Sequence, residues 1–355
     1  MRSKIYQVLN SVALTTLQRT LPITCLLIFS ATGVFAQQQD PKTQLETAKT
    51  FARQGDFGNA IVVLNRALQK EPNNLEMLKD LAFDYYMQRD YTKGLATAKL
   101  LIERSDADVQ CYQILGLLYK GSDDRADCEK LYKEGIKKFP NEGVLYNEYG
   151  EMLWTKGDYS AIRQWEKGIE VDPNYSSNYY NASKYYYLTF DKVWSLLYGE
   201  IFLNLESYSQ RTAEIKQLLL ESYKKLFSET NVKKDQNTKS TFVVAYLDGI
   251  NKQSSALAMG VTPEALIILR SQFIEDWFKK NAIQFPFRLF EYQRQLMKEG
   301  LFDAYNQWIF GPADDLTTYQ TWANTHNEEY TRFNNFQKGR IFKLPQGQYY
   351  QIVSK

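Results

Sequence analysis

The sequence holds few of the side chains that usually carry out catalysis or bind metal ions. Among its 355 residues, one is a histidine, His326, and three are cysteines, Cys25, Cys111 and Cys128. A zinc site needs about four closely placed Cys, His or carboxylate ligands, and these dispersed residues do not supply them. A Cys–His nucleophile would require Cys111 or Cys128 to reach a distant part of the chain. We therefore predict no metal site and no cofactor.

Sequence motifs of common active sites are also absent. The chain has no glycine-rich phosphate loop, no G-x-S-x-G nucleophile elbow and no H-E-x-x-H motif. The acid pairs Asp123–Asp124 and Asp314–Asp315 fall at expected turns or helix starts, where carboxylates favour the positive end of the helix dipole. Two distant carboxylates could still meet in space, as they do in glycosidases. The sequence favours a protein that is not an enzyme, and the alternative is an active site within residues 240–355.

The elements that must position any binding site repeat along the N-terminal half. Small residues recur with a period of about 34 residues, slightly shortened before the last of them, and a large apolar or aromatic residue follows each three positions later. A second small residue and a closing proline complete most of the units. Small side chains let two antiparallel helices approach closely, and proline stops the second helix. The anchors of the five units, meaning these first small residues, are Ala48, Ala82, Gly116, Gly150 and Ala182.

This pattern resembles the tetratricopeptide repeat (TPR) over about residues 41–206. The resemblance implies an all-α fold, a right-handed superhelix of antiparallel helix hairpins, with turns at Gly55-Asp56 and Gly157-Asp158. An apolar N-terminal segment and aromatic-rich helices after the repeats make the chain similar to exported TPR proteins of Bacteroidetes-type bacteria. That resemblance implies no particular activity.

The N-terminal segment, residues 1–36, has the pattern of a signal peptide. An apolar run at 21–36 ends in Val34-Phe35-Ala36 and is preceded by three basic residues, Arg2, Lys4 and Arg19. A transmembrane anchor is the alternative, but the run is short against the roughly 20 residues that a bilayer requires. Cleavage would give an exported protein, periplasmic or associated with the cell envelope, without a membrane span.

Removal of this segment changes the formal net charge of the chain. The full chain carries +2, and loss of three basic residues gives +2 − 3 = −1. A nearly neutral chain offers no electrostatic basis for binding nucleic acid. In an oxidising compartment Cys111 and Cys128 could pair. However, the hairpin crossing places Cys128 beside Gly116, about 7 Å along the helix from Cys111, so we predict two free, buried thiols.

The rest of the chain divides into three predicted segments. A TPR array of about five repeats and one further helix covers 37–227, a polar linker covers 228–240, and a helical C-terminal domain covers 241–355. We expect helices at 262–281 and 315–337 and a degenerate TPR-like hairpin at 285–311. His326 would pack on the aromatic stripe of the helix at 315–337. The tail at 340–353 would form a short hairpin or an extended strap.

The first helix of each repeat should line the concave groove of the array. Positions three before and one, four and five after each anchor combine aromatic rings with polar groups, as peptide or glycan grooves do. The candidate groove residues are Lys79, Phe83 and Tyr86 in the second unit, Asn147, Glu151 and Trp154 in the fourth, and Tyr179, Tyr186 and Tyr187 in the fifth. In the alternative arrangement, the C-terminal segment fills the groove.

These observations favour a non-enzymatic exported TPR adaptor that binds protein or peptide segments of the cell envelope in its concave groove. A glycan-binding protein of the cell envelope is the alternative. The TPR-containing starch-utilisation lipoproteins that it would then resemble are longer and carry a lipidated cysteine at the cleavage site. The carboxylate clamp of chaperone-binding TPR domains is not supported, because Leu45 and Lys49 stand where its Lys and Asn would be.

Overall fold

The computed structural model describes residues 40–351, which hold seventeen α-helices, one short 3-10 helix and no strand. The predicted signal peptide, 1–36, lies outside the described residues. The all-α TPR superhelix expected from the sequence is confirmed as a fold class. From Pro41 onward the chain forms one compact unit. None of the described helices is both long and apolar enough to cross a bilayer.

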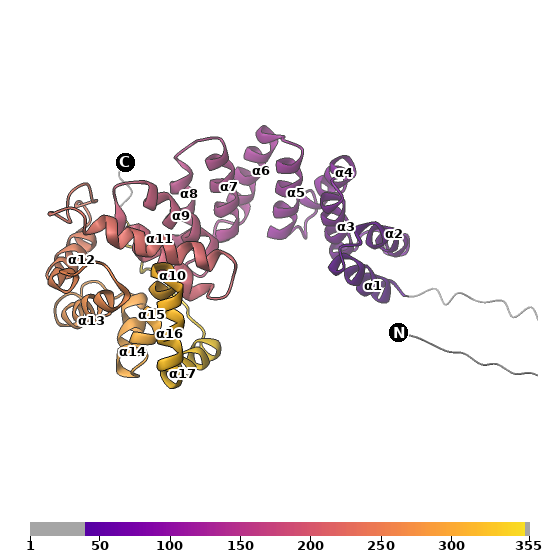
Figure 1. Ribbon diagram of the computed structural model, residues 1–355. Coiled ribbons are helices and arrows are strands. Elements are labelled where there is room, and N and C mark those ends of the chain that lie inside the picture. Colours follow the sequence, from indigo (N-terminus) through magenta and orange to yellow (C-terminus); the bar gives the residue numbers. More distant parts are fainter. Residues whose placement is uncertain (1–39, 352–355) are drawn as a thin grey trace, which may run out of the picture. The chain divides into compact units, whose positions relative to one another are not determined.

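Five helix hairpins follow one another along the array (Figure 1). They are α1 (Pro41–Arg53) with α2 (Phe57–Leu68), α3 (Leu75–Met87) with α4 (Tyr91–Ile102), α5 (Val109–Gly121) with α6 (Arg125–Lys138), α7 (Gly143–Thr155) with α8 (Ala161–Val171), and α9 (Ser176–Leu188) with α10 (Lys192–Leu205). The predicted further helix, α11 (Arg211–Leu226), continues the stack.

Each helix of the array contacts the next one in the chain, and each odd-numbered helix from α1 to α9 also contacts the next odd-numbered helix. The side on which alternate helices touch is the shorter, concave side of a hairpin stack. We call the face formed by the odd-numbered helices α1 to α11 the inner wall.

Small residues lie where the two helices of a hairpin cross, as the repeat predicts. Ala48 and Ala82 are buried, and the thiol of Cys128 lies 3.9 Å from the carbonyl oxygen of Gly116. A Cβ atom on Gly116 would lie 2.1 Å from the Tyr132 hydroxyl oxygen, and one on Gly150 would lie 2.4 Å from Nε1 of Trp165. These contacts leave room for glycine alone.

The turn within a hairpin uses one residue in the left-handed conformation. In the first and fourth hairpins this residue is the predicted turn glycine, Gly55 with φ 79° and Gly157 with φ 75°. In the second and third hairpins, Arg89 and Asp123 adopt the same conformation, with φ values of 60° and 58°. In the first three hairpins the next residue is an aspartate whose side chain accepts a hydrogen bond from a backbone N–H in the first turn of the second helix. These aspartates are Asp56, Asp90 and Asp124.

Both cysteines in the described part of the chain are free and buried, as predicted. The Cys111 thiol donates a hydrogen bond to Oδ1 of Asp108 at 3.3 Å. Burial raises the pKa of Cys111 to about 11 and also raises the pKa of Cys128. Both groups are therefore protonated and shielded, which makes them poor nucleophiles.

Further helices follow the array: α12 (Thr241–Asn251), the 3-10 helix η1 (Ser254–Leu257), α13 (Pro263–Lys280), α14 (Arg288–Lys298), α15 (Phe302–Asp314), α16 (Leu316–Thr325) and α17 (Asn327–Gly339). The predicted hairpin at 285–311 is present as α14 and α15, and α15 packs against both α11 and α13. A buried ion pair joins Arg270 of α13 to Glu200 of α10. Glu200 also accepts hydrogen bonds from Gln293 and Tyr305, at 2.6 and 2.8 Å, so these helices are fixed to the last repeat.

One helix of the C-terminal part differs from the prediction. The helix expected at 315–337 is broken at His326, which has φ −113° and ψ 35°. The His326 ring packs on Trp322 of the predicted aromatic stripe, with 4.9 Å between ring centroids, although the residue is exposed.

The tail forms no hairpin, because residues 340–351 contain no strand. They run as an extended strap whose backbone and side chains form hydrogen bonds with the array, and no second strand is paired with it. The Leu344 N–H donates to Oδ1 of Asn174 at 2.9 Å, and Nε2 of Gln346 donates to the Val171 carbonyl at 3.1 Å.

The segment 228–240, predicted as a linker, consists of turns without a helix. It packs against the α9–α10 turn. Nε2 of Gln236 donates to the Phe190 carbonyl at 2.7 Å, and its Oε1 accepts from the Lys192 N–H at 2.8 Å. The division of the chain into a repeat domain and a C-terminal domain stays a prediction.

The Gly150 crossing yields a stability prediction. We expect Gly150→Ala to lower the free energy of unfolding by about 1–3 kcal/mol, because the new methyl group overlaps the Trp165 ring. Urea denaturation measures the change. Gly339→Ala is the matched control, since a Cβ there meets no atom within 4 Å. Equal stability of the two variants would contradict the crossing geometry.

Candidate partner-binding surface

Lysine–carboxylate ion pairs cross the inner wall from one odd-numbered helix to the next. In each pair, a lysine of the earlier helix meets a carboxylate on, or just before, the later helix. Exposed pairs of this kind add little stability, but each pair occupies the two charged groups that form it. The pairs are Lys49–Glu76, Lys79–Asp108, Lys120–Glu148 and Lys184–Glu214.

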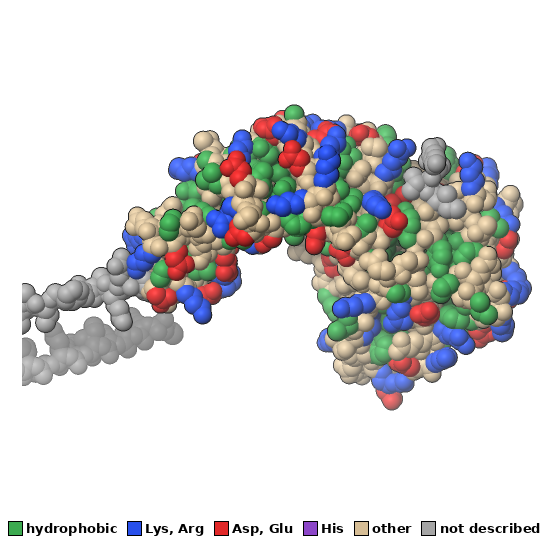
Figure 2. Space-filling view, turned by 180° about the vertical axis from the view of Figure 1, so that it is seen from behind, with side chains coloured by type: hydrophobic (Ala, Val, Ile, Leu, Met, Phe, Trp, Pro, Cys, Tyr) green, Lys and Arg blue, Asp and Glu red, His purple; other side chains and the backbone are tan. Residues whose placement is uncertain are grey.

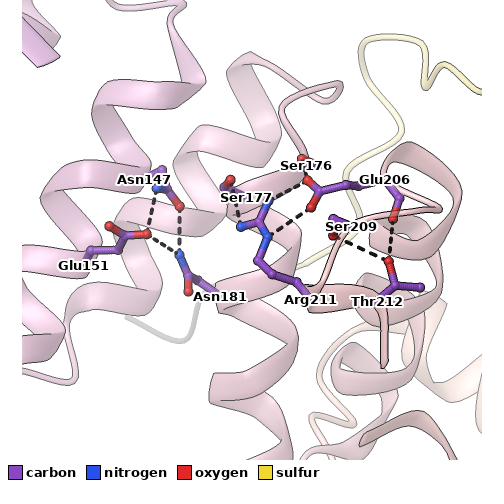
Figure 3. Close-up of polar contacts among 9 residues, drawn as sticks. All are labelled: Asn147, Glu151, Ser176, Ser177, Asn181, Glu206, Ser209, Arg211 and Thr212. Atoms are coloured by element: carbon purple, nitrogen blue, oxygen red, sulfur yellow. Dashed lines mark hydrogen bonds and ion pairs between the residues drawn. The ribbon is translucent and has the colours of Figure 1, made fainter. Parts of the chain in front are cut away.

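The junction between α7 and α9 is built differently (Figure 3). Nδ2 of Asn147 donates to Oε1 of Glu151 at 3.1 Å. Nδ2 of Asn181 donates to Oδ1 of Asn147 at 2.8 Å and to the same Glu151 oxygen at 3.2 Å. Among residues 40–351, no lysine or arginine forms an ion pair with Glu151, which accepts hydrogen bonds from two amides instead.

A second polar group lies beside it, between α9 and α11 (Figure 3). The Arg211 guanidinium binds both carboxylate oxygens of Glu206 and donates from Nη1 to Oγ of Ser177 at 3.1 Å. The Ser176 hydroxyl donates to Glu206 Oε2 at 2.7 Å. Arg211 also stacks over the Tyr180 ring, 4.7 Å from its centroid. These contacts fix α11 against α9.

A pocket of about 550 Å³ opens between α7, α9 and α11. The Trp154 ring lies 5.9 Å, between centroids, from both Trp165 and Tyr185. We call this cavity the Trp154 pocket. Its lining combines aromatic, apolar and polar groups, including Trp154, Asn181, Tyr185, Tyr187, Leu218 and Glu221.

The structure brings together four of the predicted groove residues. Trp154 and Tyr187 line the Trp154 pocket. Asn147 and Glu151 lie at its edge, because both accept hydrogen bonds from Asn181, which lines the pocket. The three residues predicted in the second unit lie apart from them, on α3. Lys79 is engaged with Asp108, and the ring of the exposed Phe83 lies 6.2 Å, between centroids, from Tyr86.

The two remaining predicted residues, Tyr179 and Tyr186, are buried. The Tyr179 hydroxyl donates to the Pro173 carbonyl at 3.0 Å, just as the Tyr146 hydroxyl donates to the Pro140 carbonyl at 2.9 Å. The two tyrosines are separated by the same length of chain as the two prolines. Tyr179 is thus the equivalent of a core residue in the preceding repeat, and its placement in the groove is corrected.

The correct anchor of the fifth unit is Ser183 rather than Ala182. The Ser183 hydroxyl donates to the Ser195 carbonyl at 2.9 Å. Ser183 and Ser195 are twelve positions apart in the sequence, as are Gly116 and Cys128, which meet at the crossing of the third hairpin. A one-residue deletion between α7 and α8 shifts the register. With this anchor, the wall positions of the fifth unit are Tyr180, Lys184, Tyr187 and Leu188. In the sequence, the spacing from Pro140 to Pro173 is one position shorter than the repeat period, and this spacing would have indicated the correct wall positions.

The C-terminal strap covers Tyr186 but not the Trp154 pocket. The Tyr186 hydroxyl donates to Oε1 of Glu166 at 2.5 Å and accepts a hydrogen bond from Gln351. Burial raises the pKa of Glu166 to about 7. No strap residue up to Gln351 lines the Trp154 pocket.

Few other groups in the described part of the chain could support chemistry. Within residues 40–351, no three His, Cys, Asp or Glu side chains are placed to hold a metal ion. A smaller pocket between α1 and α3 holds Asp80 and Asp84. Asp84 is 3% exposed, and burial together with repulsion from Asp80 raises its pKa to about 7.

Comparison with known proteins places a tetratricopeptide repeat at residues 41–84, where the model of that family matches the chain. This match covers α1, α2 and most of α3. The search of curated proteins found no match to this chain.

Several solved TPR structures are similar to about half of the chain. A thermophilic TPR protein of Thermus thermophilus, TTC0263, is 16% identical, with a TM-score of 0.42 over 51% of this chain and 99% of that one. MamA is 19% identical, with a TM-score of 0.36 over 54% of this chain and 95% of that one. YrrB, described as a TPR protein with an unusual peptide-binding site, is 13% identical, with a TM-score of 0.35 over 51% and 93%.

Asp84 yields a prediction of pH-dependent stability. Because its folded pKa lies above that of an unfolded aspartate, the folded state holds its proton more tightly, and stability falls as the pH rises from about 4 to about 7. We expect Asp84→Asn to leave the free energy of unfolding nearly unchanged at pH 4 and to raise it at pH 8, by no more than about 4 kcal/mol.

Urea denaturation at the two pH values measures this effect. The control is Asp235→Asn, an exposed aspartate with φ 61°, a conformation that asparagine tolerates. It should show no such pH dependence. A gain for Asp84→Asn that is the same at pH 4 and pH 8 would count against a raised pKa.

Proposed function

We propose that this protein is a non-enzymatic scaffold that binds an extended segment of a partner protein on its inner wall, at the Trp154 pocket. The observation that carries the proposal is the pocket itself. There, the half-buried rings of Trp154, Tyr185 and Tyr187 lie next to the amide of Asn181, on α7 and α9. Rings supply contact area with little loss of conformational entropy, and the Asn181 amide can orient a peptide backbone.

The dimensions of the wall suit an extended peptide. Packed helices lie about 10 Å apart, and each residue of an extended chain advances about 3.3 Å. A segment that crosses α7, α9 and α11 would therefore place about six residues on the wall. The repeat match at residues 41–84 supports a protein partner, since stacked repeats provide extended concave binding surfaces.

The charged groups near the pocket support binding rather than catalysis. Glu214 is paired with Lys184, and Glu221 is paired with Lys224 at 3.2 Å. The alternative of an active site within residues 240–355 gains no support. The surface pocket between α12 and α13 holds Asp276, which is already paired with Lys252 and Lys280.

The surface carries no large area of one charge on the face shown in Figure 2, where basic and acidic side chains are interspersed. This agrees with the nearly neutral net charge and gives no support for a nucleic-acid partner.

We also propose that the protein acts outside the cytoplasm, in the periplasm or the cell envelope. The support is the signal-peptide pattern of residues 1–36. We expect the mature protein to begin at Gln37 and to occur in the periplasmic or envelope fraction. N-terminal sequencing of the protein from fractionated cells measures this, and an intact Met1 in the cytoplasmic fraction would contradict it.

The proposed binding site predicts the effect of removing its rings. We expect Trp154→Ala and Tyr187→Ala each to weaken the binding of heptapeptides, selected from a displayed random library with the wild-type protein, by at least tenfold. Fluorescence anisotropy measures the affinity. Tyr208→Ala is the control, because Tyr208 is exposed but lies outside the pocket. A library that yields no binders, with binding on a glycan array instead, would favour the glycan alternative.

A further inference from the structure

We infer that the partner segment places a lysine or arginine side chain against Glu151, at the edge of the Trp154 pocket. The inference rests on the proposed function and states which chemistry the partner must supply. It follows from the charge pattern of the inner wall, the hydrogen bonds of Glu151 and the aromatic groups beside it.

The α7–α9 junction lacks the lysine that its neighbours have. In the α5–α7 junction, Lys120 of α5 pairs with Glu148 of α7. The equivalent positions of the next junction, one repeat later, are Trp154 and Asn181. An aromatic ring thus stands in place of the cation and an amide in place of the carboxylate. Glu151 nevertheless adds a negative charge to the same junction.

The nearest charges do not neutralise Glu151. Burial lowers the pKa of Lys120, but the charge of Glu148 and, more weakly, that of Glu151 raise it, and the net shift is upward. Lys120 therefore interacts with both carboxylates. Its ion pair is with Glu148, so these three side chains carry a net charge of −1. On the other side of the pocket, the charge of Glu214 is matched by Lys184 and that of Glu221 by Lys224.

Glu151 is oriented but not saturated. Oε1 accepts both amide hydrogen bonds, and no group within residues 40–351 donates to Oε2. Glu151 is half-buried, so part of the residue remains accessible to a partner. A cation that binds a carboxylate held by two hydrogen bonds loses little entropy in ordering it.

The Trp154 pocket also fits the rest of a basic side chain. Asn181 both lines the pocket and donates to Glu151, so the carboxylate and the aromatic rings share one boundary. The methylene groups of lysine or arginine pack on aromatic surfaces while the charged end remains free to pair. A cation beside Trp154 would also be attracted to the ring face, whereas the Tyr187 ring already has Lys225 over it, 3.8 Å from its centroid. An acidic partner side chain would be repelled by Glu151.

Peptide selection tests the inference directly. A random heptapeptide library is selected in parallel with the wild-type protein and with Glu151→Gln, which keeps the side-chain shape and removes the charge. We expect wild-type binders to share a lysine or arginine at one position. Their affinity for Glu151→Gln should fall at least tenfold, and replacing that basic residue by norleucine or citrulline should cost little more in this variant. Glu103→Gln, which changes an exposed acid directly after the end of α4, is the control and should bind as the wild type does.

The outcomes separate this inference from the proposed function. Peptides that bind, depend on Trp154, share no basic residue and bind Glu151→Gln equally well would overturn the inference and leave the binding site in place. A library that yields no binders, or binders unaffected by Trp154→Ala, would overturn both. Binding that requires the basic residue and weakens as ionic strength rises would support the inference.

Discussion

The close approach of two antiparallel helices at a small residue sets the geometry of each hairpin. At Gly116 and Gly150 the facing helix brings Tyr132 and Trp165 so near that a single methyl group would overlap them. The crossing point therefore cannot slide along the helix. Once it is fixed, the helical period determines which residues face the neighbouring hairpin and which face the inner wall. The binding surface is a consequence of where these small residues stand.

Much of the fold could be predicted because its determinants are local and repeated. The glycine turns, the proline stops and the pairing of Gly116 with Cys128 follow from spacing along the sequence. The start of α13 was also predictable, since Thr262 caps the helix and Pro263 opens it. Arg89 and Asp123 show the limit of such rules. They adopt the conformation expected of glycine because the rest of each hairpin fixes the turn.

The candidate site could be predicted only in part. Counting from Ala182 gave a register that was one residue out, so Tyr179 and Tyr186 were assigned to the groove although they belong to the core. The network of Asn147, Glu151 and Asn181 depends on which side chains meet across two helices. The break at His326 and the path of the strap likewise depend on contacts between segments far apart in the sequence, such as Leu344 with Asn174.

The junction between α7 and α9, where the repeat is one residue shorter, also differs from the other junctions in the side chains that form its contacts. Elsewhere on the wall, lysine and carboxylate side chains join consecutive hairpins, and each such pair uses up the charges it contains. Between α7 and α9 the hairpins are joined by neutral amides, so the junction holds without consuming the charge of Glu151. The helices beside it are fixed by Arg211 and by the buried Glu200–Arg270 pair. An unmatched carboxylate on a rigid wall, next to an open aromatic pocket, has the organisation that selective binding of a cationic side chain requires.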